Sequence, residues 1–191
     1  MNFPLFSNNM NTSMNIIQPR TKYTLRILMD NDIPDDCAQH YMSKNNNFAG
    51  SYNTDSGLDL ITPQDVPVDF LKVGKVDYKI RCEMYNNETG RCAPYYIFAR
   101  SSISSTPFML ANNVGIIDLN YRGPIMGKFR CFEENQIIKK YSKMVQICTE
   151  NLSPFTVQLV SELSQTDRGE NGFGSTDRLL NIINHYTIFT E

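Results

Sequence analysis

Alternating hydrophobic and polar positions dominate the chain. In residues 22–28, "KYTLRIL", Tyr23, Leu25 and Ile27 fall on one side, which is the period of a half-buried strand. Six further segments alternate in the same way or are rich in β-branched and aromatic residues: 76–85, 94–102, 114–119, 123–132, 143–152 and 156–163. Turn-forming stretches such as "NNETG", "SSTP" and "NYRGP" separate them. Many short strands at near-regular spacing predict an all-β sandwich or barrel.

Helical periodicity is hardly sustained anywhere. The segment 136–147, "QIIKKYSKMVQI", fits a helical period only if forced, and its β-branched flanks favour a pair of strands. The chain has 191 residues and no visible internal repeat, which fits one compact domain with tails. We expect a leader at 1–20, a β-barrel at 21–164, a glycine-rich lid at 165–177 and an apolar extension at 178–191.

Composition excludes several classes of function. The formal net charge is −2 and Lys and Arg form no run, so nothing favours binding to nucleic acid. No apolar stretch approaches the roughly 20 residues that span a bilayer, so no membrane partner is expected. Residues 1–20 lack the basic and apolar regions of a secretion signal, and we expect a cytoplasmic or nuclear protein. Abundant Asn and Ile with little Ala indicates an AT-rich genome, such as that of a large DNA virus acting in its host cell.

Cysteine and histidine usage gives no metal site. The five cysteines form no Cys-x-x-Cys pair, and the chain has only two histidines, His40 and His185, so a zinc site is not expected. Cys82 and Cys92 flank a predicted hairpin turn and could face each other across strands, but cytosolic thiols stay reduced. We interpret the cysteines as small buried hydrophobes. Neither histidine has a visible partner, so we expect neither to act in catalysis.

Five short patches carry residues suited to chemistry: "DSGLDL" (55–60), "ARSSISS" (99–105), "NNVGIIDLNYRG" (112–123), "KYSKMVQI" (140–147) and "DRGENGFGSTD" (167–177). Each alone has an ordinary structural interpretation, such as a turn entering a strand or a flexible linker. Together they offer what a nucleoside triphosphate needs. Phosphates need guanidinium and hydroxyl donors, and the patches supply them from Arg100, Ser101, Ser102, Arg168, Ser175 and Thr176.

Other residues of the patches complete this picture. Asp59 could reach a hydrated divalent cation through water, because such cations prefer oxygen ligands. Phe173 could give a base an aromatic face on which to stack. Glycines, among them Gly174, would let the backbone approach phosphates closely.

The five patches, in this order and spacing, resemble the five motifs of the trimeric all-β dUTPase family (dUTP diphosphatase), over about residues 22–177. The resemblance implies a jelly-roll-like β-barrel that forms a homotrimer with sites at the subunit interfaces. It also implies Mg²⁺-dependent hydrolysis of dUTP to dUMP and pyrophosphate by attack of water on the α-phosphorus. That reaction keeps uracil out of DNA and supplies dUMP for thymidylate synthesis.

The resemblance assigns roles at the reacting centre. Asp118 matches the carboxylate that orients and deprotonates the attacking water, which needs a base within hydrogen-bond reach. Gln146 matches a glutamine near that water, and Asp59 matches the acidic residue that touches the water shell of the metal. Arg100 and Ser101 match the phosphate-binding pair of the second motif.

It also assigns the residues that recognise the nucleoside. Tyr121 would pack under the deoxyribose and leave no room for a 2′-hydroxyl. The backbone around Asn112 and Gly115 would read uracil and reject cytosine and thymine. The last motif would close over a neighbouring subunit's site, with Arg168 on the γ-phosphate and Phe173 over the base.

Two departures from the family pattern would weaken binding. Lys143 stands where the fourth motif usually has arginine, and lysine cannot make a bidentate guanidinium contact. Asp177 replaces a closing glycine and adds a negative charge near the phosphates. Two alternatives stay open: a dCTP deaminase-type enzyme on the same scaffold, and a dUTPase-like binding or regulatory trimer with little turnover. The presence of both Asp118 and Tyr121 favours phosphohydrolysis over deamination.

Overall fold

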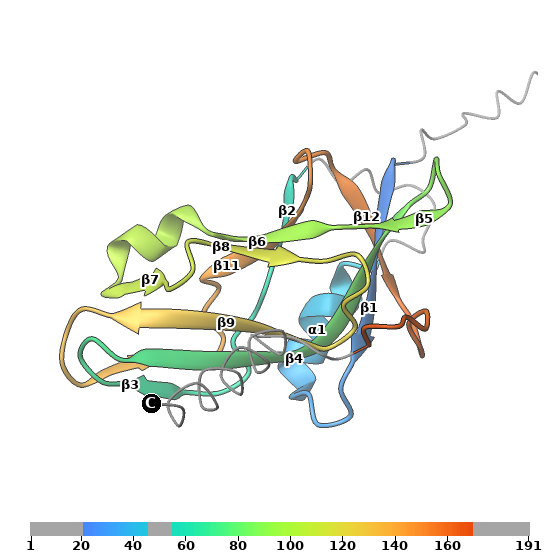
Figure 1. Cartoon of the computed structure of the whole chain (residues 1–191). Helices are drawn as coiled ribbons and strands as arrows, with labels where there is room; N and C mark the ends of the chain where they lie inside the picture. The colour runs from blue at the N-terminus through green and yellow to red at the C-terminus, as the bar shows by residue number, and fades with distance from the viewer. Residues whose placement is uncertain (1–20, 46–54, 170–191) are drawn as a thin grey trace, which may run out of the picture.

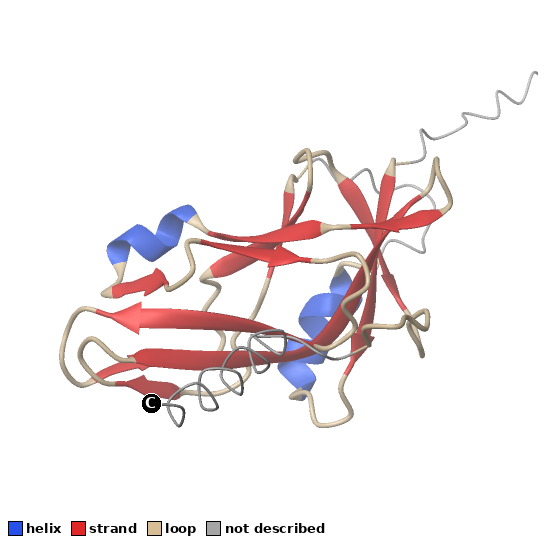
Figure 2. Ribbon diagram, viewed as in Figure 1, coloured by secondary structure: helices blue, strands red, loops and turns tan. Residues whose placement is uncertain are grey.

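The structure, a computed structural model, describes residues 21–45 and 55–169. These residues form twelve strands, one α-helix and one short 3₁₀ helix (Figures 1 and 2). The prediction of an all-β protein is therefore confirmed. No helix among the described residues is long and apolar enough to cross a bilayer.

The helices are α1 (Asp35–Ser43) and the 3₁₀ helix η1 (Ser101–Ser105). The strands, in chain order, are β1 (Tyr23–Met29), β2 (Gly57–Asp59), β3 (Val66–Val68), β4 (Val73–Asn86), β5 (Arg91–Ala93), β6 (Tyr95–Ala99), β7 (Phe108–Leu110), β8 (Val114–Ile117), β9 (Pro124–Cys131), β10 (Gln136–Ile138), β11 (Val145–Thr149) and β12 (Phe155–Leu159).

The strands form three sheets. The largest has the order β12-β1-β4-β9-β7, with β5 also paired to β4. The second has the order β2-β11-β6-β8, and β10 pairs with β3 in the third. In Figure 1 the long strand β4 runs across the molecule, with β9 beside one part of it and β1 beside the other. The change of partner coincides with a shift in register between Asp77 and Arg81, around Lys79, whose φ is 59°.

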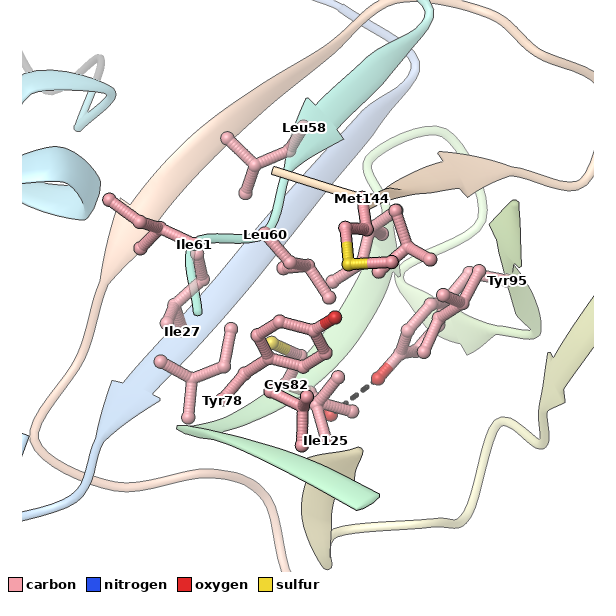
Figure 3. Close-up of a cluster of buried hydrophobic side chains, with 14 of the residues drawn as sticks. Ile27, Leu58, Leu60, Ile61, Tyr78, Cys82, Tyr95, Ile125 and Met144 are labelled. Atoms are coloured by element: carbon pink, nitrogen blue, oxygen red, sulfur yellow. Dashed lines mark hydrogen bonds between the residues drawn. The ribbon is translucent and has the colours of Figure 1, made fainter. Parts of the chain in front are cut away.

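The core contains side chains from the two larger sheets (Figure 3). Tyr23, Leu25 and Ile27 are fully buried, as the alternation in β1 predicts. The Tyr95 hydroxyl donates a hydrogen bond to the carbonyl oxygen of Cys82 at 3.3 Å. The Tyr78 hydroxyl is also buried, and no hydrogen-bond partner for it is found among the described residues.

All seven predicted strand segments contain a strand, but two details of the prediction are wrong. Segment 94–102 does not stay extended, because β6 ends at Ala99 and residues 101–105 form η1. The Ser104 hydroxyl bonds to the Ser101 carbonyl there, a local contact that competes with strand pairing. The two strands of 136–147 do exist, but they do not pair with each other, since β10 pairs with β3 and β11 lies between β2 and β6.

Helix α1 was not predicted. Only Cys37 and Tyr41, four residues apart, are buried on it, too short an apolar stripe to stand out from the surrounding chain. Its start does carry a recognisable signal, because Pro34 precedes it and Asp35 and Asp36 fall in the first turn.

The five cysteines all lie in the described part of the chain and none forms a disulfide. In the β4–β5 register, Cys92 lies opposite Tyr85 rather than Cys82. The idea that Cys82 and Cys92 face each other is therefore wrong. Their interpretation as buried hydrophobes is confirmed except at Cys92, which is half-buried.

Candidate active site

A cavity of about 640 Å³ lies where β2, β11 and the end of β6 meet the C-terminal end of α1. Four predicted site residues line it: Asp59, Arg100, Ser101 and Gln146. Strand pairing explains why, because Gln146 of β11 lies directly opposite Asp59 of β2 and Arg100 follows the last residue of β6. We call this cavity, with its lining residues, the Asp59 pocket.

Arg100 is held in a fixed position within the Asp59 pocket. Its Nε lies 2.7 Å from Asp59 Oδ1, and its Nη1 donates to the carbonyl oxygen of Lys143 at 2.8 Å. The same guanidinium reaches Ser102 Oγ at 3.4 Å. Since a guanidinium fixed in this way does not have to be ordered when a ligand arrives, Arg100 is preorganised to bind an anion.

The charged side chains lining the Asp59 pocket are mostly cationic. Lys44 and Lys143 join Arg100, against the carboxylates of Asp55 and Asp59. This balance suits an anionic group such as a phosphate chain.

Gly57 is a site residue that sequence reasoning missed. A Cβ atom at this position would lie only 2.3 Å from Gln146 Oε1. A glycine is therefore needed for the Gln146 side chain to lie across β2. The signal was present in the first patch, where the glycine precedes "LDL", but its purpose depends on the β2–β11 pairing.

His40 also lines the Asp59 pocket, and the expectation that it has no partner is wrong. Its Nε2 lies 2.9 Å from the carbonyl oxygen of Asp59. Burial lowers the pKa of His40, against the opposing effect of this hydrogen bond, so the ring is neutral at pH 7. The neutral ring must then carry its proton on Nε2 and donate it to the carbonyl.

A second cavity, of about 210 Å³, lies beside β8 and the turn that follows it. It brings together five other described candidates, Asn112, Gly115, Asp118, Tyr121 and Arg168, while Ser102, in η1, lines neither cavity. We call it the Asp118 pocket. Among the described strands β8 pairs only with β6, so its other edge offers backbone groups to a ligand.

Charge and packing fix the side chains of the Asp118 pocket. Arg168 forms an ion pair with Asp118 and its guanidinium carbon lies 5.9 Å from the centre of the Tyr121 ring. The Tyr121 hydroxyl donates to the carbonyl oxygen of Pro124 at 3.0 Å. A Cβ at Gly123 would lie 2.4 Å from this hydroxyl oxygen, so glycine is needed for the ring to take its place.

A buried ion pair supports the turn that carries Asp118 and Tyr121. Arg122 Nη2 lies 3.0 Å from Glu83 Oε2, and the two side chains are 9% and 2% exposed. Arg122 Nη1 also donates to the carbonyl oxygens of Leu119 and Tyr121, both at 2.8 Å. Burial alone would raise the pKa of Glu83, but hydrogen bonds from Ser164 and Arg26 and the charge of Arg122 lower it overall.

Sequence reasoning gave Glu83 and Arg122 no role. Glu83 occupies a polar position in the alternation of β4, so nothing marked it as buried. Arg122 was visible only as part of a motif.

The remaining candidates of the lid, Phe173, Gly174, Ser175 and Thr176, lie outside the described residues, as do Asp177 and His185. Arg168 is described, and it contacts Asp118 of its own chain. Apart from Ser102, the described candidates therefore divide between two pockets, with Asp118 in one and Gln146 in the other.

The side chains of the Asp59 pocket suit a metal ion that keeps most of its water ligands. Among the described residues there is no group of three or more His, Cys, Asp or Glu side chains that could hold a metal ion. The two carboxylates of the pocket, Asp55 and Asp59, with nearby hydroxyls, fit Mg²⁺ that keeps water ligands and takes others from substrate phosphates.

Comparisons with known proteins all point to one family. The dUTPase family model matches residues 44–177. The chain is 30% identical over 128 residues to the deoxyuridine 5'-triphosphate nucleotidohydrolase of Clostridium kluyveri, covering 66% of this chain and 86% of that one. It is 32% identical over 122 residues to the enzyme of the same name from Paramecium bursaria Chlorella virus 1, covering 63% and 82%. The crystal structure of dUTPase from Streptococcus mutans aligns with a TM-score of 0.47 at 18% identity, over 64% of this chain and 91% of that one. The chain belongs to the dUTPase family.

Proposed function

We propose that this protein is a dUTP diphosphatase, which hydrolyses dUTP to dUMP and pyrophosphate. The observation that carries the proposal is the division of the candidate residues into two complementary pockets. The Asp59 pocket offers cationic side chains for phosphates. The Asp118 pocket offers a carboxylate, a buried tyrosine ring and the edge of β8 for the reacting centre and the nucleoside.

The complete site is formed in a homotrimer, in which the Asp118 pocket of one copy faces the Asp59 pocket of another. The support is that Asp118 and Gln146, both assigned to the attacking water, line different pockets of one chain. Only contact between copies unites them, and closed cyclic symmetry then repeats the site at each interface.

Asp118 acts as the general base. Its carboxylate accepts a proton from the water that attacks the α-phosphorus, and the bond to the bridging oxygen of the pyrophosphate breaks. Arg168, which pairs with Asp118 in the free chain, moves to the γ-phosphate when nucleotide binds. Arg100 and Ser101 hold the phosphates and stabilise the negative charge that develops on the leaving pyrophosphate.

Magnesium, bound together with the triphosphate, would neutralise phosphate charge, with Asp59 holding it through water. Arg100 keeps the Asp59 carboxylate in place at 2.7 Å. His40 holds the backbone of the same residue at 2.9 Å.

Tyr121 selects deoxyribose. Its ring is fixed by its hydrogen bond to Pro124 and by close contact with Gly123, so it cannot retreat from an added 2′-hydroxyl. The backbone of β8 around Gly115, with Asn112, reads uracil, because a base with the wrong donors and acceptors would leave buried groups unpaired.

Residues 165–177 form the lid, in which Phe173, Gly174, Ser175 and Thr176 cover the bound nucleotide. Its first residues are attached to the turn that carries Tyr121. Thr166 Oγ1 donates to the carbonyl oxygen of Asn120 at 2.6 Å, and the Arg122 amide donates to that of Gly169 at 2.8 Å. The enzyme acts in the cytoplasm or the nucleus, where dUTP competes with dTTP for DNA synthesis.

The test is to incubate the purified protein with dUTP, dCTP, dTTP and UTP in Mg²⁺ and to identify the products by chromatography. Formation of dUMP and pyrophosphate from dUTP alone is the expected result. Deamination of dCTP would replace the proposal by the sister activity. Binding of dUTP without turnover of any nucleotide would leave a binding or regulatory trimer.

A further inference from the structure

The C-terminal end of α1 forms one wall of the Asp59 pocket. His40 and Ser43 of α1 and Lys44, the residue that caps it, line the cavity. None of them belongs to the five patches that carry the resemblance to the family. Of the three, Ser43 and Lys44 have been assigned no role.

Helix α1 is attached firmly to the strand that carries Asp59. His40 Nε2 bonds to the Asp59 carbonyl at 2.9 Å. Two residues further along, the Ile61 amide donates to the hydroxyl of Tyr41 at 3.4 Å, and the Tyr41 ring is fully buried. The position of α1 relative to Asp59 is thus set by contacts from two adjacent residues of the helix, His40 and Tyr41.

The residues that follow α1 are fixed as well. Asn45 forms a parallel β-bridge with Val157, and its Oδ1 accepts a hydrogen bond from the Leu159 amide at 3.4 Å. The Lys44 amide closes the helix by bonding to the Tyr41 carbonyl at 3.1 Å. The backbone at Lys44 is therefore held on both sides, by His40 towards β2 and by Asn45 towards β12, and Lys44 lines the pocket.

Lys44 and Lys143 both line the Asp59 pocket. Beside Arg100, which Asp59 holds at 2.7 Å, the two lysines are the other cations among the residues that line this pocket.

We propose that Lys44 is an additional phosphate-binding residue of this protein, supplied by α1 and acting with Lys143 on the phosphate chain of the substrate. The proposal rests on the proposed function, because it concerns the same pocket. Lys143 offers a single ammonium where a guanidinium would make two hydrogen bonds. A second ammonium from α1 restores cationic contact with the phosphates, and the His40 and Asn45 contacts place it there.

The experiment compares wild type with Lys44→Gln in the full-length protein, using inorganic tripolyphosphate as a ligand and dUTP as a substrate. Lysine at this position adds a charge-assisted contact, so we expect tripolyphosphate affinity to fall by roughly five- to tenfold by calorimetry. We also expect KM for dUTP to rise by a similar factor with little change in kcat, and Lys44→Arg to restore both. The control is Lys75→Gln, which removes the same charge from an exposed position of β4 outside the pocket and should change neither.

The outcomes separate this inference from the proposed function. Normal dUTP hydrolysis with unchanged tripolyphosphate affinity and KM in Lys44→Gln would overturn the role of Lys44 and leave the function standing. If the wild type did not hydrolyse dUTP, the tripolyphosphate titration would still decide whether Lys44 binds phosphate. Weaker binding by Lys44→Gln alone would support the role of Lys44, and equal binding by all variants would overturn it.

Discussion

Arg168 and Asp118 form an ion pair within one chain. In the absence of nucleotide, Asp118, the proposed general base, is thus paired with Arg168, which is proposed to bind the γ-phosphate. In the proposed mechanism, a triphosphate that attracts Arg168 would release Asp118 for the attacking water. Arrival of the substrate and exposure of the base would then be coupled through a single guanidinium.

The first prediction concerns Asp118. Asp118→Asn should keep nucleotide binding but lower kcat by about 10³-fold, since an amide of the same shape cannot accept the proton from water. Binding is measured with a non-hydrolysable dUTP analogue and turnover by release of pyrophosphate. Full turnover in this variant would remove Asp118 from the mechanism.

The second prediction concerns Lys143, which lines the Asp59 pocket. Lys143→Arg should lower KM for dUTP by about threefold, because a guanidinium can form a second hydrogen bond to the phosphates. Lys75→Arg, a matched exchange on β4 outside the pocket, should leave KM unchanged. An unchanged or higher KM in Lys143→Arg would mean that residue 143 does not contact the phosphate chain.

The third prediction uses two buried tyrosines that differ in one respect. Tyr95 donates a hydrogen bond to Cys82, whereas no partner of the Tyr78 hydroxyl is found among the described residues. Tyr95→Phe should lower the free energy of unfolding by about 1 kcal/mol, since it leaves the Cys82 carbonyl without this donor. Tyr78→Phe should not lower it, because the removed hydroxyl gains nothing from burial.

Urea denaturation of both variants measures this difference. A larger loss of stability in Tyr78→Phe than in Tyr95→Phe would show that the Tyr78 hydroxyl has a partner after all. The slope of each transition has to match wild type for the comparison to be made.

The fourth prediction concerns the ion pair of Glu83 with Arg122. Glu83→Gln should destabilise the protein by about 3 kcal/mol at pH 7, because it leaves the buried Arg122 charge uncompensated. The pKa of Glu83 is lowered from 4.5 in the folded protein. The carboxylate therefore contributes stability above pH 4.5, and this contribution is lost as the pH falls through the lowered pKa.

The difference in unfolding free energy between wild type and Glu83→Gln should accordingly shrink as the pH falls below 4.5. The matched control is Glu88→Gln, whose side chain is 65% exposed and pairs with Lys22 at 3.6 Å, and which should have little effect. A difference that stayed constant from pH 7 down to pH 3 would contradict an ionised Glu83 in the folded state.

The strands were predictable from sequence because each carries its own signal. Tyr23, Leu25 and Ile27 alternate with polar residues whatever the rest of the chain does. Helix α1 was not predictable, since its buried face consists of only Cys37 and Tyr41 and depends on the sheet against which it packs. The strand pair in 136–147 was only half right for a related reason. Local pattern indicates a strand, while its neighbours are chosen by distant segments.

The candidate site, too, was predictable where local patterns identify residues and not where distant segments meet. The ordered patches identified Asp59, Arg100, Gln146, Asp118 and Tyr121 as a set, and the resemblance implied that the third patch serves a different subunit from the first, second and fourth. Where these residues lie, in two pockets of one chain, follows from sheet topology. The roles of Gly57, His40 and Glu83 arise from contacts between segments far apart in sequence. Such contacts leave no local pattern, so only the fold could reveal them.

We propose that each dUTP site combines the Asp118 pocket of one copy with the Asp59 pocket of another. Asp118→Asn and Arg100→Ala chains, each expected to be nearly inactive alone, would be mixed, unfolded and refolded together, and assayed for release of pyrophosphate from dUTP. If the two residues come from different copies, random assembly makes about a quarter of the sites fully wild type and restores that share of activity. If both residues act within one chain, no site in the mixture is intact, and activity that stays at the level of the separate variants would contradict the account.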